Sequence, residues 1–275
     1  MEGTGSSLFL GIDLSTQGCK AVVLDEESFE ILAESRVNFE EDLPHYNTTS
    51  GFVRLPEGRV VSPTLMWVEG LELVLKRLSQ GGGLPREKFK YIKGVSASGQ
   101  MHGSVYWSRK APECLSRLQR GPSPPPSSSP APQQKKDALV DLMEDAFSFP
   151  MSPIWMDTST TETCRSLENF MGGSDAVSRV TGSRAYERFT VHHIVEARKR
   201  DTTKFDSDVF RVSLVSSFVV SLLCGQISPI DWSDASGMNL MDLQTKMWSP
   251  EIVKWSGVKH LEELLGDPIA PWTVV

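Results

Sequence analysis

The chain has 275 residues and a formal net charge of −7, and its 39% hydrophobic and 23% charged residues are typical of a globular protein with a large core. The negative surplus disfavours a general nucleic-acid-binding surface, because such a surface needs clustered basic residues. The longest apolar run, Val212 to Cys224, is interrupted by serines and is too short to cross a bilayer.

The first residues carry neither a basic leader nor an apolar signal core. The cysteines lie far apart without a Cys-x-x-Cys spacing, which favours free thiols over a zinc site or a disulfide framework; they are Cys19, Cys114, Cys164 and Cys224. We therefore expect a soluble cytoplasmic protein without a nucleic-acid or membrane partner.

Residues 8–24 are predicted to form a hairpin of two apolar strands around a polar turn at 14–18. Backbone N–H groups of such a turn can converge on an anion, and Ser15 and Thr16 add hydroxyl groups. Asp13 tolerates a phosphate there only if a cation such as Mg²⁺ lies between them, and Lys20 can add positive charge. The alternative is an ordinary surface hairpin, because so short a motif recurs by chance.

Further elements follow from periodicity and from helix start and stop signals. We expect a third strand over 31–38, a helix with Ser62 as N-cap and Pro63 at its first position, strands over 91–98, 104–107 and 153–157, and helices over 159–171 and 207–224. The segment 121–136 is rich in Pro and Ser and is predicted to be a disordered surface insertion.

Several polar residues have both a functional and a structural interpretation. His102 lies in a Gly-flanked bend, where it can face a cleft or be an exposed turn residue. Arg184 and Arg188 alternate with aromatic residues in a loop, as a ligand clamp or as structural ion-pair partners. Asp231 and Asp234 can serve acid–base or metal chemistry, but capping of turns is the favoured interpretation, because no His or third carboxylate accompanies them.

Taken in order, these segments resemble the motifs of the FGGY family of carbohydrate kinases, and within it the eukaryotic xylulose kinases. The matching segments are 11–17 with Lys20, 99–107, 153–157, 181–189 and 228–239. The resemblance implies an α/β fold of the actin-like, ribonuclease-H-like type, with a mixed sheet flanked by helices. It also implies two domains with sugar and ATP in the cleft between them, and phosphoryl transfer from ATP to D-xylulose.

The resemblance assigns the N-terminal hairpin to the phosphates of ATP. Asp13 and Lys20 match the catalytic positions, with Asp13 also carrying Mg²⁺, and Ser15, Thr16 and Gln17 match the ATP-binding turn. Most of the family has Gly where this chain has Ser15, but the eukaryotic xylulose kinases resemble this chain at that position.

The resemblance assigns His102 and Arg188 to the sugar hydroxyls. The family's general base, an Asp in a Gly-Asp-Asn motif, has no match, since Gly266-Asp267 is followed by Pro268. We therefore expect residues 8–275 to be the N-terminal sugar-binding domain of a truncated kinase that lacks the nucleotide-binding domain and does not turn over alone. The alternative is a non-catalytic sugar-binding fragment or isoform.

Overall fold

A computed structural model describes residues 6–80, 83–119 and 138–275, and its largest sheet is mixed and four-stranded. The order is β3-β2-β1-β6, with β1 antiparallel to β2, β2 antiparallel to β3, and β1 parallel to β6. The strands are β1 (Leu8–Leu14), β2 (Gly18–Asp25), β3 (Ile31–Asn38) and β6 (Ile92–Gly99). The expected N-terminal hairpin, the third strand and the strand over 91–98 are confirmed.

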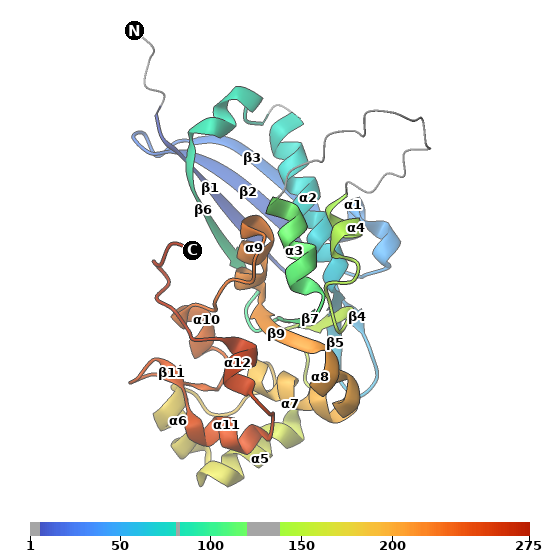
Figure 1. Cartoon of the computed structure of the whole chain (residues 1–275), viewed down its shortest axis with the longest axis vertical. Coiled ribbons are helices and arrows are strands. Elements are labelled where there is room, and N and C mark those ends of the chain that lie inside the picture. Colours follow the sequence, from blue (N-terminus) through green and yellow to red (C-terminus); the bar gives the residue numbers. More distant parts are fainter. Residues whose placement is uncertain (1–5, 81–82, 120–137) are drawn as a thin grey trace.

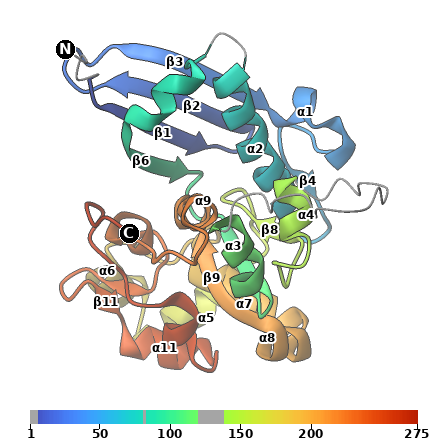
Figure 2. The same ribbon diagram turned by 45° about the horizontal axis from the view of Figure 1, so that its top comes forward.

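One face of this sheet is covered by two helices, α2 (Thr64–Gln80) and α9 (Val215–Cys224). Along β1, Ile12 and Leu14 are buried beneath these helices while Asp13 is exposed, as the alternation of side chains in a strand requires. Figures 1 and 2 show α2 lying along the sheet and α9 near β6. Asp13 therefore leaves the sheet on the side away from its core.

Short strands connect this sheet to the rest of the chain. One small sheet has the order β4-β5-β8, β7 pairs with β9, and β10 pairs with β11. Their bounds are β4 (Val53–Arg54), β5 (Val60–Pro63), β7 (Ser104–Ser108), β8 (Met151–Pro153), β9 (Val209–Leu214), β10 (Met241–Asp242) and β11 (Met247–Trp248).

The remaining helices are mostly short. They are α1 (Phe39–Asp42), α3 (Ala111–Gln119), α4 (Leu139–Met143), α5 (Thr161–Met171), α6 (Ser174–Thr181), α7 (Thr190–Arg200), α8 (Thr202–Asp208), α10 (Trp232–Ser236), α11 (Pro250–Ser256) and α12 (Leu261–Leu265), with 3₁₀ turns at Pro44–Tyr46 and Arg86–Tyr91.

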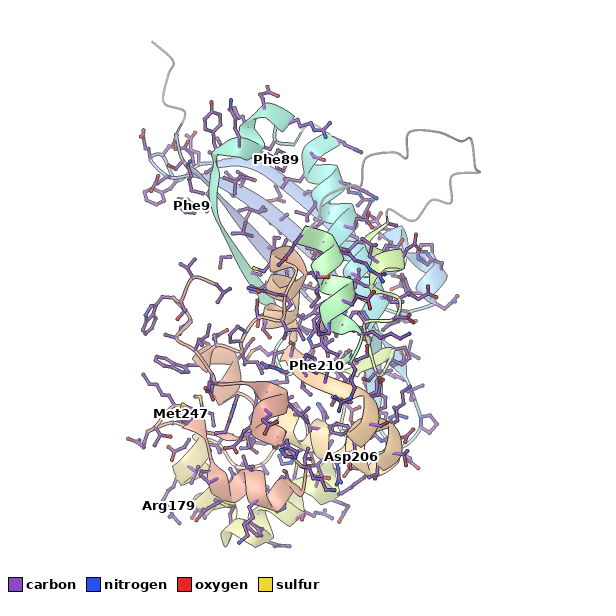
Figure 3. All side chains as sticks on the ribbon, in the orientation of Figure 1. Phe9, Phe89, Arg179, Asp206, Phe210 and Met247 are labelled. Atoms are coloured by element: carbon purple, nitrogen blue, oxygen red, sulfur yellow. The ribbon has the colours of Figure 1, made fainter. Side chains whose placement is uncertain are left out.

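The buried residues form two hydrophobic clusters. The first joins the four-stranded sheet to α2, α3 and α9, and the second joins β9 to the helices at the opposite end of the molecule. Figure 1 shows the sheet at one end and α5, α6 and α11 at the other. In Figure 3, Phe9 marks the sheet end and Arg179 the helical end.

Two expected helices begin later than predicted. Ser62 and Pro63 belong to β5, which pairs with β8, so α2 begins only at Thr64. Residues 209–214 form β9 instead of helix, because β7 offers this β-branched segment an antiparallel partner. The expected strand at 153–157 is wrong beyond its first residue, because β8 covers Met151–Pro153 and ends there.

Other expectations concern the ends of helices, the state of the cysteines and membrane-spanning helices. α5 ends at Gly172 and α9 at Gly225, both in the left-handed conformation that favours glycine. All four cysteines are free thiols. Within the described ranges, no helix is long and apolar enough to cross a bilayer. The expected insertion at 121–136 lies outside the described residues.

Candidate functional site

A cavity of about 410 Å³ lies where β1 and β6 end. It is lined by Asp13, Ser15, Thr16, Gly99, Gln100, Met101, His102, Trp155 and Arg188. Strands β1 and β6 are parallel and pair Leu14 with Gly99, so the two following loops emerge side by side. The predicted site residues Asp13, Ser15, Thr16, His102 and Arg188 are thereby brought to one cavity, although they are distant in sequence.

The turn after β1 is closed by its own hydrogen bonds. The Ser15 amide and hydroxyl both donate to the Gly18 carbonyl, at 2.9 and 3.0 Å. Asp13 accepts a hydrogen bond from the Ser98 hydroxyl at 3.0 Å through one carboxylate oxygen, and the residue is exposed at the cavity. The carboxylate is therefore held in position from β6 while remaining open to a ligand.

Thr16, Trp155 and Gln100 form a short hydrogen-bonded chain across the cavity wall. The Trp155 indole donates to the Thr16 hydroxyl at 3.0 Å, and Thr16 donates to Gln100 Oε1 at 3.3 Å. Gln100 Nε2 is buried without a partner among the described residues. A buried amide donor without a partner costs free energy, so this nitrogen is available to a ligand oxygen.

His102 is held in one orientation. Its backbone is left-handed with φ of 67°, and its Nδ1 lies 2.9 Å from the Gly237 carbonyl oxygen. The His102 and Phe189 rings are packed edge to face, with their centroids 5.0 Å apart. A carbonyl only accepts, so Nδ1 carries the proton and Nε2 is left as an acceptor. Burial, opposed by the Gly237 hydrogen bond and reinforced by the charge of Arg188, lowers the pKa of His102, so the ring is neutral at pH 7.

The two arginines of the 181–189 loop differ in role. Arg184 lies 3.5 Å from the Glu168 carboxylate, which is a structural ion pair. Arg188 lines the cavity, and its guanidinium lies 5.9 Å from the centre of the Tyr186 ring. Among the described residues no carboxylate is within ion-pair distance of Arg188. Its hydrogen-bond donors are therefore free for a ligand.

Other predicted residues lie outside the cavity lining. Lys20 faces the same side of the sheet as Asp13 but pairs with Glu34 at 2.9 Å, and both side chains are half-exposed. Gln17 is exposed at the tip of the turn. Asp231 caps α10 by accepting from the amides of Ser233 and Asp234, which confirms the capping interpretation for that residue.

Asp13 is the single carboxylate among the lining residues of the cavity. In the part of the chain that the structure describes, no group of three or more His, Cys, Asp or Glu side chains is placed to hold a metal ion. Mg²⁺ commonly takes one or two carboxylates together with water and substrate phosphates. Asp13 offers the single carboxylate that this mode of binding requires.

Sequence reasoning did not select Gln100 and Trp155 as site residues. Both lie in segments that carry the family resemblance, so their position in these motifs is a signal that could have identified them. Their role depends on the Trp155–Thr16–Gln100 chain of hydrogen bonds, whose members are 84 and 139 residues apart. No local pattern predicts such a chain.

The mixed α/β architecture is similar to that of solved sugar-kinase structures of the actin-like, ribonuclease-H-like type. The fold matches the crystal structure of a xyloylose kinase from Brucella ovis with a TM-score of 0.69 at 20% identity, over 96% of this chain and 42% of that one. The expected α/β fold class is thus confirmed.

Comparison with known sequences gives a more specific similarity than the fold does. Residues 133–265 match the N-terminal domain of the FGGY family of carbohydrate kinases. Xylulose kinase 2 of Arabidopsis thaliana is 45% identical over 96% of this chain, and xylulose kinase of Rattus norvegicus is 41% identical over 100% of it. The chain is therefore similar to the N-terminal part of the FGGY family of carbohydrate kinases. It spans 44% and 47% of the lengths of these two relatives and corresponds to their N-terminal portion.

Proposed function

We propose that residues 8–275 are the sugar-binding part of a kinase that phosphorylates D-xylulose with ATP to D-xylulose 5-phosphate. The observation that carries the proposal is the single cavity lined by Asp13, Thr16, His102 and Arg188. The names of the relatives, xylulose kinases at 41 to 45% identity, support the choice of sugar.

The sugar end of the cavity offers complementary hydrogen-bonding groups. His102 presents Nε2 as an acceptor for a sugar hydroxyl, and Arg188 and Gln100 Nε2 present donors to sugar oxygens. A polyol needs both kinds of partner, because each hydroxyl donates once and accepts as well. The neutral ring of His102 avoids placing a second positive charge beside Arg188.

The hairpin end of the cavity suits the phosphates of ATP. Asp13 would hold Mg²⁺, which would neutralise phosphate charge when bound. We propose that the Ser15–Gln17 turn faces the phosphates and that Lys20 reaches them by leaving Glu34, an exchange that costs little because both side chains are half-exposed. Positioning and electrostatics supply most of the acceleration in phosphoryl transfer.

A second candidate, sugar binding without turnover, is favoured for the 275-residue chain by one observation. Asp13 is the only carboxylate of the cavity lining, and its proposed role with Mg²⁺ leaves no carboxylate beside it to take the proton of the sugar hydroxyl. A positioned base typically contributes about 10² to 10⁴ in rate.

Calorimetric titration of the 275-residue chain with D-xylulose tests the proposal. Arg188→Gln is expected to weaken D-xylulose binding by about 10- to 100-fold, since a charged hydrogen bond contributes ~1.5 to 3 kcal/mol. Arg184→Gln is the matched control, because it lies in the same loop and faces Glu168 instead of the cavity. Absence of D-xylulose binding by the folded chain, or equal loss in both variants, would contradict the proposal.

ADP release with D-xylulose, ATP and MgCl₂ separates the two candidates. We expect no release above background from this chain. Saturable, D-xylulose-dependent release that disappears in Asp13→Ala would refute binding without turnover and establish a complete kinase site.

A further inference from the structure

A second cavity, of about 250 Å³, lies between the β4-β5-β8 sheet and α7. It is lined by Arg59, Val61, Tyr106, Phe149, Met151, Pro153, His193, Ala197 and Arg200. It shares no lining residue with the cavity that contains Asp13 and His102. The proposed sugar kinase function leaves its polar groups unused.

Two guanidinium groups face this cavity without an ion-pair partner. In the described ranges, no carboxylate lies within ion-pair distance of Arg59 or Arg200. Arg200 donates one hydrogen bond, to the Ser159 hydroxyl at 3.0 Å, and the buried Nε of Arg59 has no partner. Arg59 is partly buried and Arg200 is exposed, and both guanidinium groups keep hydrogen-bond donors that a ligand in the cavity can use.

His193 adds a buried polar group to the same wall. It is 3% exposed, and neither ring nitrogen has a hydrogen-bond partner. The closest carboxylate oxygen, Oδ1 of Asp157, is 3.9 Å from Nε2, beyond hydrogen-bond distance. The Asp157 oxygens are instead engaged by the backbone amides of Val60 and Ser159. The imidazole therefore has one N–H without an acceptor, which is costly unless something enters the cavity.

The local charge favours an anion. Burial lowers the pKa of Arg59, and the positive charge of Arg200 lowers it further, whereas Asp157 and Glu57 oppose the effect. Burial likewise lowers the pKa of His193, against an opposing contribution from Asp157, so this ring is neutral at pH 7 and can donate a hydrogen bond without adding charge. An anion between the guanidiniums would offset their mutual repulsion.

We propose that Arg59, Arg200 and His193 form a binding site for a small phosphate-bearing molecule, separate from the sugar cavity. Guanidinium forks match the oxygens of a phosphate, and a phosphate monoester carries about −1.5 to −2 charge at neutral pH, which balances two arginines. The apolar part of the wall, Phe149 and Met151, accommodates the organic portion of such an ester.

Calorimetric titration of the 275-residue chain with inorganic phosphate and with glycerol 3-phosphate tests this site. We expect saturable binding of both, with glycerol 3-phosphate tighter because of the apolar wall. Arg59→Gln and Arg200→Gln should each weaken binding about tenfold or more. Arg54→Gln is the matched control, because Arg54 lies on β4 near Phe52 and does not line the cavity. D-xylulose affinity should stay within twofold of wild type in all three variants.

A measurement on the wild-type chain tests the site even if the variants do not fold. Phosphate should shift the assigned ring signals of His193 in an NMR titration, with the same midpoint as the calorimetry. Three outcomes would each overturn the proposed site. They are a heat of phosphate binding that is unchanged in both Arg variants, His193 signals that do not move, and no binding at ~20 mM phosphate. The D-xylulose titration reports on the proposed function independently of these outcomes.

Discussion

Gly237 holds the His102 ring in place, so Gly237→Ala tests how the sugar cavity is organised. A Cβ at this position would lie 2.9 Å from His102 Cε1 and 3.1 Å from Nδ1, whereas non-bonded carbon atoms rest about 3.5 to 4.0 Å apart. The backbone at Gly237, with φ of −86° and ψ of 10°, is accessible to alanine. The clash therefore falls on the imidazole, which must move by roughly 0.5 to 1 Å.

This displacement disturbs two hydrogen bonds. It breaks or lengthens the 2.9 Å bond from Nδ1 to the Gly237 carbonyl, and it turns Nε2 away from its proposed sugar hydroxyl. A neutral hydrogen bond contributes about 0.5 to 1.5 kcal/mol net, and 1.4 kcal/mol corresponds to a factor of about ten in affinity. We expect the Kd for D-xylulose to rise about tenfold.

The assay is calorimetric titration with D-xylulose, together with thermal unfolding to establish that the variant folds. Ser236→Ala is the matched control, because Ser236 is the last residue of α10, directly before Gly237, and among the described residues its hydroxyl bonds only the Ser233 carbonyl, at 2.7 Å. The control should stay within twofold of wild type. An unchanged Kd in folded Gly237→Ala would refute the reasoning, since the ring would then move without cost or lie away from the sugar.

Three further predictions concern single groups. His102→Ala should weaken D-xylulose by ~1 to 3 kcal/mol and leave ATP affinity within twofold; equal losses in calorimetry would indicate a structural role. Asp13→Asn should weaken MgATP about tenfold or more and spare D-xylulose, and the reverse pattern would contradict the assignment. Burial lowers the pKa of His192 to about 4, so the unfolded chain binds a proton between pH ~6.5 and 4 that the folded chain excludes. Stability to urea should therefore fall as the pH drops through this window, and His192→Gln should reduce the slope by up to ~1.4 kcal/mol per pH unit; an unaltered slope would exclude His192 as the cause.

Local signals in the sequence determined several elements. The apolar alternation of Leu8–Leu14 and the polar turn after it sufficed for the hairpin, because strand and turn preferences act over a few residues. Gly172 and Gly225 marked two helix ends for the same reason, since only the local backbone conformation is at issue. The ordered motifs also sufficed to predict the family and its fold class.

Pairing between distant strands decided what local preference could not. Residues 209–214 look continuous with the helix that follows, but β7 provides an antiparallel partner, so the segment becomes β9. Ser62 has the features of an N-cap, yet pairing of β5 with β8 keeps the chain extended through Pro63. In both cases a hydrogen-bonded partner about 90 to 110 residues away outweighs the local signal.

The residues of the candidate site were likewise predicted in part from the sequence and in part only from the structure. The sequence supplied His102 and Arg188 as candidates through the family resemblance of the ordered motifs in which they lie. The tertiary structure added the physical difference between the two arginines of this loop, since Arg188 faces the cavity and Arg184 pairs with Glu168. It likewise added Gln100, whose free amide depends on the Trp155–Thr16 hydrogen bond. Side-chain roles depend on which partners three-dimensional packing brings within hydrogen-bond distance, and sequence spacing does not contain that information.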